Sequence, residues 1–547
     1  MKNSLHFPRL ALLALTLLIA ASSAMAYDIE VDGIYYTVSS GRAYVTYKDN
    51  NFNSYSGDVV IPAQFTYEGE TYTVLEVWDY AFLQCENLTS VSIPNTVTKV
   101  GNSAFSRCPK LNKVTIPSSV TYIGNYAFTQ CTSLASIAIP NSVTKLGFSA
   151  FEECTALSSV TLSNQLEVIE MLTFYGCTSL KNVTIPASVK TIDNQAFENC
   201  VSLERVTLSQ GLEQILDYAF RSCESLQQIT LPNTLTKIGA HAFRESGLKS
   251  ITVPNSVKTI DSFAFYECQN LQQAKIGDGV KEIGEYAFVR CLEMTTLTLG
   301  NHVETIGTHA FSGCYKLAAV NIPNSVTTLE DEAFSYCHAL QSVVIGNGVK
   351  TIGNYAFHEC ENMSNLIIGN NVTSIGTNGF YGCQALKRVD IPNSVETIGN
   401  CAFLQCQGLT KINIGSGVKT IGYGVFASDW RISSIFCHAV TPPTFIVNES
   451  WSTFNYNVYE EATLYVPKES INKYKNAYIW KDFANIQAIP DHIPGDVNGD
   501  GEVNIADVNV LIDAILTGDH SIDGDVNEDH EINIADVNVL IDMILKH

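Results

Sequence analysis

Two short acidic segments near the C-terminus place oxygen-bearing side chains at a spacing that suits metal binding. The first runs from Asp496 to Asp507 and the second from Asp525 to Asp536. In each, positions 1, 3, 5, 9 and 12 hold a carboxylate or an amide, and position 7 can add a backbone carbonyl, which is the calcium-ligand pattern of an EF-hand loop. The candidate ligands of two Ca²⁺ ions are therefore Asp496, Asn498, Asp500, Glu502, Asn504 and Asp507, and Asp525, Asn527, Asp529, Glu531, Asn533 and Asp536.

Two helices are needed to hold these loops together. Apolar residues spaced three and four apart follow each loop, as one packing stripe of a helix requires. The stripes are Val508, Leu511, Ile512, Ile515 and Leu516, and Val537, Leu540, Ile541, Ile544 and Leu545. An acidic disordered tail would lack such stripes. Because the loop carboxylates repel one another, the pattern predicts that this module folds on binding calcium.

Cysteine is the second residue type that could carry chemistry. Of the 16 cysteines, 14 fall three residues after a repeated phenylalanine. Coils stacked about 4.8 Å apart leave equivalent Cβ atoms too far apart for a disulfide, so we predict a buried column of free thiols that act as small apolar residues. A metal or redox site would need an exposed, electropositive setting. Cys437 is expected in the core, whereas Cys401 breaks the pattern and is expected to be an exposed lone thiol.

A repeat positions these cysteines. Sixteen phenylalanines, from Phe82 to Phe426, recur every 23 residues, with one 22-residue step between Phe243 and Phe265. The cleanest copy reads Ile-Gly-Asn-Tyr-Ala-Phe-x-x-Cys-x-x-Leu-x-x-Ile-x-Ile-Pro, from Ile123 onward. This period predicts a mainly β solenoid with one short strand per coil, in which each coil buries its apolar face against the next. Pro or Gly after the strand is expected to end it.

Residues 76–436 resemble the BspA-like leucine-rich repeats of bacterial surface proteins, which are related to the Treponema repeat type. The resemblance rests on the recurring Ala-Phe-x-x-Cys-x-x-Leu-x-x-Val-x-Ile-Pro-x-Ser-Val-x-x-Ile-Gly. It implies a right-handed leucine-rich-repeat solenoid of 23-residue coils. Members of this family are associated with attachment to host extracellular-matrix proteins, epithelial surfaces and other bacteria, so the resemblance implies adhesion.

Residues 491–547 resemble a type I dockerin module, a small α-helical, EF-hand-like domain whose two halves are near-identical. The resemblance implies calcium binding and a cohesin-like partner. Ile505-Ala506 and Ile534-Ala535 stand where dockerins of cellulose-degrading complexes often carry a Ser-Thr-type pair, which argues against a cohesin of that kind. His530 replaces the turn glycine Gly501 of the first loop, so the second calcium site is expected to bind more weakly or to bend differently.

The remaining segments complete the domain plan. Residues 1–26 read as a signal peptide, because Lys2 and Arg9 precede an apolar run that is too short to cross a bilayer and Ala24-Met25-Ala26 offers a cleavage site. Residues 27–75 are expected to form a β-rich N-terminal cap, and residues 437–490 a C-terminal cap and linker with a helix over 471–478. The protein is therefore expected to be secreted or at the bacterial cell surface, without a transmembrane anchor of its own.

Outward residues of the strands are the candidate ligand-binding positions. Most coils carry Thr or another polar residue there, but Val344 and Ile367 are apolar, and Arg388 and Asp390 follow one coil later. An apolar pair beside charged residues is typical of a protein contact, although scattered exposed apolar residues are also normal.

Two classes of function follow from these patterns. One is an exported adhesion protein that binds host or bacterial surface proteins, and the other is a non-catalytic component of a carbohydrate-degrading complex that docks to a cohesin. The formal net charge of −23 argues against nucleic acid and anionic lipid as partners. An enzyme is not expected, because the 11 histidines show no recurring catalytic or metal-ligand spacing.

Overall fold

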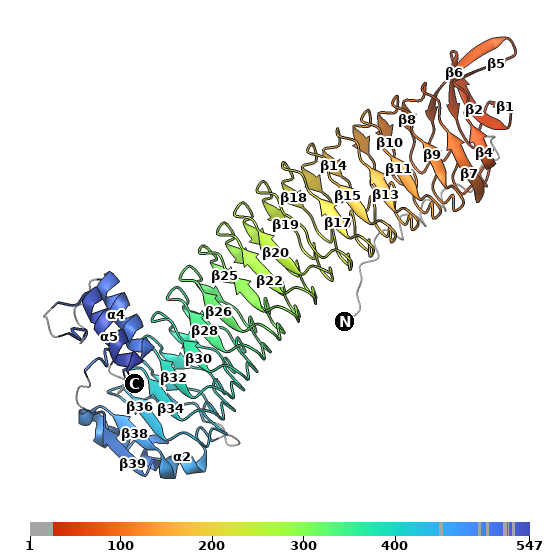
Figure 1. The fold of residues 1–547 in the computed structure, drawn as a ribbon. Helices are drawn as coiled ribbons and strands as arrows, with labels where there is room; N and C mark the ends of the chain where they lie inside the picture. Colours follow the sequence, from red (N-terminus) through yellow and green to blue (C-terminus); the bar gives the residue numbers. More distant parts are fainter. Residues whose placement is uncertain are drawn as a thin grey trace. The chain divides into compact units, whose positions relative to one another are not determined.

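The computed structural model describes residues 26–447, 452–490, 494–498, 503–517, 522, 524–527 and 531–546 (Figure 1). The signal peptide predicted for residues 1–26 lies outside this part of the chain, except for its last residue. The chain divides into two compact units, Met1–Ile251 and Thr252–His547, and each is described by itself.

The first unit begins with a β-rich cap. Strands β1 (Ile29–Val31), β2 (Ile34–Ser39) and β3 (Arg42–Val45) form an antiparallel meander. β3 then pairs in parallel with β6 (Glu70–Val77), which also forms a hairpin with β5 (Gln64–Tyr67). β4 (Ser56–Val60) pairs with the first strand of the repeats, β7 (Asn87–Ser92). The cap therefore covers the strand edges of the first coil.

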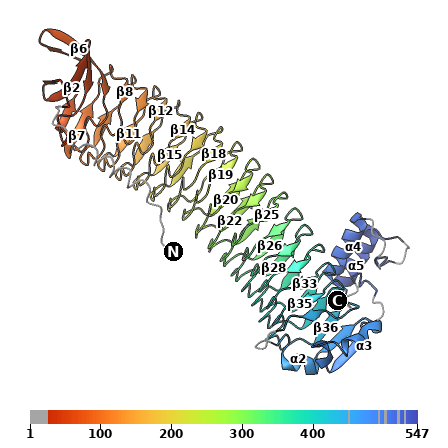
Figure 2. The same cartoon turned by 180° about the vertical axis from the view of Figure 1, so that it is seen from behind.

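Most coils of the first unit have two strands, one longer and one of two residues, and most strands pair in parallel with those of the next coil. The coil that holds Gln228 has an isolated bridge to Arg205 in place of the longer strand. Figure 2 shows the short strands from the other side. After β7, the longer strands are β9 (Lys113–Thr115), β11 (Ser136–Ala138), β13 (Ser159–Thr161), β15 (Asn182–Thr184) and β17 (Arg205–Thr207), and β20 (Ser250–Val253) contains the unit boundary. The short strands are β8 (Lys99–Val100), β10 (Tyr122–Ile123), β12 (Lys145–Leu146), β14 (Val168–Ile169), β16 (Thr191–Ile192), β18 (Gln214–Ile215) and β19 (Lys237–Ile238).

The second unit repeats this architecture. Its longer strands are β22 (Gln273–Ile276), β24 (Thr296–Thr298), β26 (Ala319–Ile322), β28 (Ser342–Ile345), β30 (Asn365–Ile367), β32 (Arg388–Ile391), β34 (Lys411–Ile414) and β36 (Ser434–Cys437). Its short strands are β21 (Thr259–Ile260), β23 (Glu282–Ile283), β25 (Thr305–Ile306), β27 (Thr328–Leu329), β29 (Thr351–Ile352), β31 (Ser374–Ile375), β33 (Thr397–Ile398), β35 (Thr420–Ile421) and β37 (Thr444–Phe445). The prediction of a mainly β solenoid of 23-residue coils is confirmed, but the expectation of one strand per coil is wrong.

A third row of backbone hydrogen bonds joins the coils at the turn that contains the phenylalanine. The N–H of Tyr126 bonds to Phe148, that of Phe128 to Ala150 and that of Gln130 to Glu152. The first and last residues of this run have φ of +56° and +60°, and equivalent residues of other coils are also left-handed. In this turn every second residue, Tyr126, Phe128 and Gln130, donates its backbone N–H to the next coil. The repeat therefore has three rows of inter-coil bonds, although its sequence shows one obvious strand.

The phenylalanines form a stacked column inside each unit. Neighbouring rings from Phe82 to Phe243 lie 4.9–5.6 Å apart, and those from Phe265 to Phe426 lie 4.9–5.8 Å apart. Every one of these side chains is fully buried. Aromatic pairs at this separation are worth about 0.5–1.5 kcal/mol beyond the burial of their area, so the column contributes to the cohesion of the coils.

The thiols lie beside this column, free and buried as predicted. Most repeat thiols donate a hydrogen bond to the carbonyl of the phenylalanine in the preceding coil, whereas the first, Cys85, donates to Phe52 O. Cys154 Sγ, for example, bonds to Phe128 O at 3.1 Å, and the same carbonyl accepts the N–H of Cys131 at 3.2 Å. Burial raises the pKa of Cys131 to about 12, so the thiol stays protonated and can donate. Cysteine fits here because it is both a small apolar residue and a weak donor.

Cys401 is buried, which corrects the prediction of an exposed lone thiol. Its side chain is 8% exposed and packs with Leu404 and Ala427, while Tyr381 and Tyr423 flank the cluster. Large aromatic neighbours from the adjacent coils cover the position, and this cannot be read from the residues of its own column. Burial raises the pKa of the Cys401 thiol.

A C-terminal cap closes the second unit. It contains α2 (Tyr456–Glu461), β38 (Thr463–Val466), η1 (Lys468–Ser470), α3 (Ile471–Tyr474), η2 (Trp480–Asp482) and β39 (Asn485–Ala488). Phe454 extends the phenylalanine column, with its ring 5.5 Å from that of Phe426. The helix expected over 471–478 is shorter and ends at Tyr474, because the chain turns there. This turn packs the fully buried Trp480 against Tyr474, with ring centroids 5.4 Å apart.

Asp429 occupies the position that cysteine holds in most other coils, three residues after Phe426. The side chain is fully buried, and neither carboxylate oxygen has a hydrogen-bond partner among the described residues. Burial raises its pKa to about 8, and the nearby Cys406 backbone offsets only part of this increase. The carboxyl group is therefore protonated in the folded protein near neutral pH.

We predict that Asp429→Cys, which restores the column residue, stabilises the protein at alkaline pH. The pKa of Asp429 is about 8 when folded, against 3.8 for the ordinary group. Unfolding therefore releases a proton, and stability falls as the pH rises from about 4 to about 8. Removing the carboxyl group is expected to add about 3–5 kcal/mol above about pH 8 and nothing below about pH 4.

The measurement is the thermal midpoint as a function of pH. Asp429→Asn serves as a second variant, which removes the ionisable group but leaves a buried amide. It is expected to flatten the pH dependence in the same way. An unchanged pH profile in both variants contradicts the assignment of Asp429 as a buried, protonated carboxyl group.

Candidate calcium module and strand-face patch

The aspartates at position 12 of the two acidic loops lie in equivalent surroundings. Both Asp507 and Asp536 are fully buried. Asp507 accepts the backbone N–H of Asn498 at 3.0 Å on one oxygen and that of Asn504 at 2.8 Å on the other. Asp536 makes the same two bonds in the second loop, at 3.1 and 2.9 Å. Each carboxylate therefore ties the beginning of its loop to the end.

Residues at position 9 connect the loops to helices α4 (Ile505–Thr517) and α5 (Ile534–Leu545). Asn504 Oδ1 accepts the N–H of Ala506, and Asn533 Oδ1 accepts that of Ala535, both at 2.8 Å. At α5, Asn533 is the N-cap and Asp536 completes a capping box. Such a cap is worth about 1 kcal/mol, so the loop residues also start the helices.

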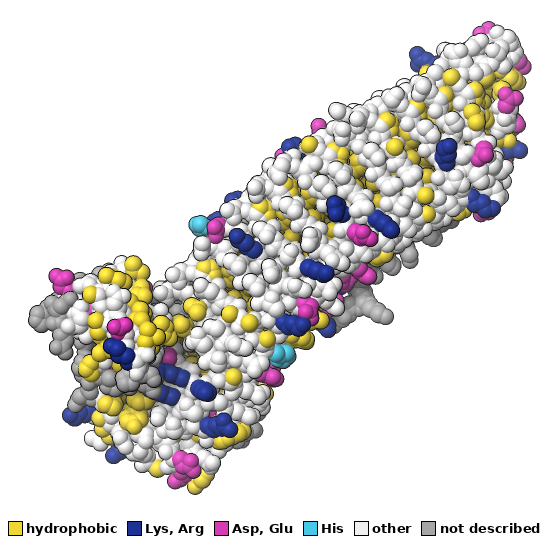
Figure 3. All heavy atoms as spheres, in the orientation of Figure 1, with side chains coloured by type: hydrophobic (Ala, Val, Ile, Leu, Met, Phe, Trp, Pro, Cys, Tyr) yellow, Lys and Arg dark blue, Asp and Glu magenta, His cyan; other side chains and the backbone are white. Residues whose placement is uncertain are grey.

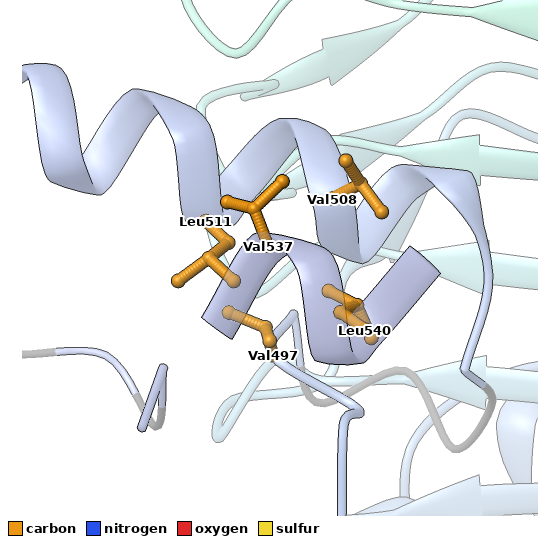
Figure 4. Close-up of a cluster of buried hydrophobic side chains, with 5 residues drawn as sticks. All are labelled: Val497, Val508, Leu511, Val537 and Leu540. Atoms are coloured by element: carbon orange, nitrogen blue, oxygen red, sulfur yellow. The ribbon is translucent and has the colours of Figure 1, made fainter. Parts of the chain in front are cut away.

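A small apolar core joins the two helices (Figure 4). It consists of Val497, Val508, Leu511, Val537 and Leu540, with partly buried residues such as Ile515 and Ile544 packed around it. Val497 comes from the first loop itself, so the packing of α4 against α5 also positions that loop. The duplicated sequence thus folds into a duplicated structure with one shared core.

Four residues of the stripes that the sequence predicts do not lie in this core. Ile512 and Ile541 are each 38% exposed, and Leu516 and Leu545 are 78% and 79% exposed. Two short helices that pack on each other can bury only one side of each, and here that side carries Val508, Leu511, Val537 and Leu540. The prediction of one fully packed stripe is wrong for these four residues, and the helix pair instead has an exposed apolar face.

The described ligand candidates fit a divalent cation chemically. Burial raises the pKa of Asp507 to about 6, and the carboxylate of Asp496 adds to the increase, while the two accepted N–H groups lower it. A bound cation favours the ionised form of such a carboxylate, and hard oxygen donors are what calcium prefers. Asp500, Glu502 and Asp529 lie outside the described residues. Within the described residues, no three His, Cys, Asp or Glu side chains form a metal-holding group.

The strand-face candidates lie on β28, β30 and β32 of the second unit. Val344 and Ile367 are direct neighbours in the parallel register of β28 and β30. Arg388 and Asp390 form an ion pair on β32, with Arg388 Nε 2.8 and 2.9 Å from the two carboxylate oxygens, and Asn413 also donates to Asp390. All four candidates are partly buried. Over the face in Figure 3, charged side chains are scattered singly or in small groups among uncharged ones.

Three of these four residues share one hollow of the second unit. Ile367, Arg388 and Asp390 line it, and residues at the start of α4, including Ile505 and Ala506, line it as well. The fourth candidate, one coil earlier, does not contribute to the lining. The sequence reasoning identified the strand residues but did not predict that the start of α4 would lie beside them.

Comparisons with known proteins identify the same two parts. A family model described as "BspA type Leucine rich repeat region (6 copies)" matches residues 75–203, 144–260, 236–362 and 327–442, which together cover more than half of the chain. A second model, for the dockerin type I domain, matches residues 494–545. No curated protein matches the chain.

Several similar solved structures are bacterial leucine-rich repeat proteins. One, from Bacteroides ovatus, has 23% identity over 77% of this chain and 100% of its own, with a TM-score of 0.43. Another, described as a leucine-rich cell surface protein from Faecalibacterium prausnitzii, has 24% identity over 79% of this chain and 100% of its own, with a TM-score of 0.32. Neither of the two family models describes an enzymatic domain. Among the described residues, no helix has the length and apolar character that a membrane crossing requires.

We predict that Leu540→Ala and Leu545→Ala, both on α5, differ strongly in effect. Leu540 is fully buried and Leu545 is 79% exposed. Truncating the buried side chain is expected to destabilise the module by about 2–4 kcal/mol, whereas the exposed one is expected to change stability by less than about 0.5 kcal/mol. Hydrogen exchange of peptides from α4 and α5, measured in the full chain with calcium, reports the difference. Equal exchange in the two variants contradicts the inward face assigned to α5.

Proposed function

The chain belongs to the family of BspA-type leucine-rich repeat proteins, and on this premise we propose that it is an exported adhesion protein. Its coils bind a surface protein of the host or of another bacterium, and its dockerin domain, ordered by two calcium ions, attaches it to a further partner. The family and the dockerin domain are typical of surface or secreted proteins, which agrees with the signal peptide expected over residues 1–26.

The observation that carries the adhesion proposal is the outward surface of β28, β30 and β32. In most coils this position is a threonine or another polar residue, but Val344 and Ile367 form an apolar pair there. The Arg388–Asp390 ion pair lies at its border, with side chains 20% and 30% exposed. An apolar centre with a polar rim is the usual arrangement of a protein interface, so we assign ligand binding to these four residues.

The dockerin domain implies a cohesin partner, and this supports a second candidate function. In that case the protein is a non-catalytic component of a carbohydrate-degrading complex. The observation that favours it is the exposed apolar face of the helix pair, which includes Leu516 and Leu545 and extends to Ile505 and Ile534, 49% and 65% exposed. Leu516 is equivalent to Leu545 in the duplicated sequence, and Ile505 to Ile534, and all four are exposed. Each half of the module therefore presents a similar apolar surface, and either surface could bind the same kind of partner.

We predict that Val344→Lys together with Ile367→Lys weakens adhesion at least about tenfold, because two charges would be desolvated in an apolar contact. The measurement is binding of the full chain to a panel of immobilised extracellular-matrix proteins. Thr184→Lys with Thr207→Lys is the matched control, since these residues are also outward neighbours on successive strands. Binding that is unchanged by the first pair, or equally reduced by the second, removes the patch from the proposal.

We also predict that calcium protects the C-terminal module from proteolysis. Without the ion, the loop carboxylates repel one another, and burial raises the pKa of Asp507 to about 6 because its ionised form is costly in the folded module, so the helices are expected to open. The full chain is digested in calcium, in magnesium and in chelator, and the cut sites are read by mass spectrometry. Equilibrium dialysis is expected to give two calcium ions per chain, and one after Asp496→Ala. Equal digestion in chelator and in calcium would contradict calcium-dependent folding.

A further inference from the structure

A cluster of aromatic side chains lies on the turns that follow β25, β27, β29 and β31. It consists of four tyrosines bridged by two histidines: Tyr315, Tyr336, Tyr355, Tyr381, His338 and His358. His358 contacts three of the tyrosines, with ring centroids 5.3, 5.4 and 4.7 Å away, and His338 contacts Tyr315 at 5.1 Å. The cluster thus spans four successive coils and lies outside the strand-face patch.

Three of the tyrosines are unusually open to solvent. Tyr315, Tyr336 and Tyr355 are 42%, 41% and 38% exposed, although their rings are held by the histidines between them. Tyr336 and Tyr355 also have left-handed backbones, with φ of +58° and +55°. This backbone conformation sets the direction in which each side chain leaves the turn, and contact with the His358 ring restrains both tyrosine rings. Rigid, exposed tyrosines are typical anchors of protein interfaces.

The charges around the cluster are negative. Burial raises the pKa of Tyr336, and the carboxylates of Glu332 and Glu359 raise it further. Burial and the neighbouring Glu361 raise the pKa of Glu359. Burial lowers the pKa of His358, and its Nδ1 has no hydrogen-bond partner among the described residues, so this imidazole is neutral near pH 7. Among the described residues, no Lys or Arg lies over these rings.

We propose that this tyrosine–histidine cluster docks a basic, Lys- or Arg-containing segment of a partner protein. The faces of tyrosine rings attract cations, each contact adding modestly at an exposed site, and the flanking carboxylates complement the same charge. The net charge of −23 would steer such a segment toward the protein. A neutral sugar could stack on the same rings, but it would gain nothing from the carboxylates, so the basic segment is favoured.

This proposal rests on the proposed function only in that the partner is a protein. The cluster and the strand-face patch occupy different parts of the coil, so the two can be tested separately. Loss of binding through Val344→Lys and Ile367→Lys leaves the cluster intact, and the variants described next leave the patch intact.

The test uses the full chain and a short, capped, labelled peptide that alternates Lys and Gly. Tyr336→Asn with Tyr355→Asn removes two rings without changing the charge, and asparagine tolerates the left-handed conformation. Asn199 and Asn378 already occupy the equivalent positions of other coils. The double variant is expected to bind the peptide about tenfold more weakly by fluorescence anisotropy. Tyr80→Asn with Tyr126→Asn, which are also left-handed, is the matched control and is expected to bind as the unaltered chain does.

A charge variant separates the contribution of the flanking carboxylates from that of the tyrosine rings. Glu359→Gln keeps the shape of the side chain and is expected to weaken binding and to reduce its dependence on salt. Equal affinity for a Glu-Gly peptide overturns the proposal, as does unchanged binding in the tyrosine variant. No measurable binding of the Lys-Gly peptide to the unaltered chain, or a preference for a neutral oligosaccharide, also overturns it.

Discussion

Register between successive coils is the constraint on which the structure depends. Parallel pairing places Thr184 beside Thr207, Ile352 beside Ile375 and Val389 beside Ile412, and in each pair the partners are 23 residues apart. Because the turn that carries the phenylalanine adds a third row of backbone bonds, no side of a coil can slip without breaking the other two. A shift of one strand residue would also turn the apolar set outward, so register and core formation support one another.

Because equivalent residues stack on one another, the side chain at each repeat position contacts the same type of side chain in the neighbouring coils, and its effect on stability is repeated along the column. Apolar columns benefit, because every phenylalanine or thiol meets copies of itself in the adjoining coils. Charged columns do not, and several neighbouring residues in them have opposite sign: Lys281 lies 2.7 Å from Glu304, and Lys419 lies 2.9 Å from Glu396, each pair one period apart. These exposed pairs are individually weak, so their main effect is to avoid rows of like charge.

Periodicity makes most of the fold predictable from the sequence, since a column residue has the same surroundings in every coil. The phenylalanine and thiol columns followed from this alone. Cys401 was assigned wrongly because its burial comes from Tyr381 and Tyr423, which belong to other columns. The second strand was missed because two residues give no alternating pattern. The exposure of Ile512, Leu516, Ile541 and Leu545 on α4 and α5 was not predicted. An apolar stripe shows which side of a helix is apolar, but it does not show how many of its residues a single partner helix can bury.

Recognition in a repetitive solenoid must come from residues that depart from the repeat, because the repeat itself presents the same surface at every coil. The departures here are concentrated in the second unit, where Val344 and Ile367 interrupt a polar row and tyrosines and histidines gather on the turns. The columns beneath them are unchanged, so these substitutions alter the surface without altering the core. Selection for binding can therefore act on the outer residues of a few coils, while the inter-coil register fixes their spacing and direction.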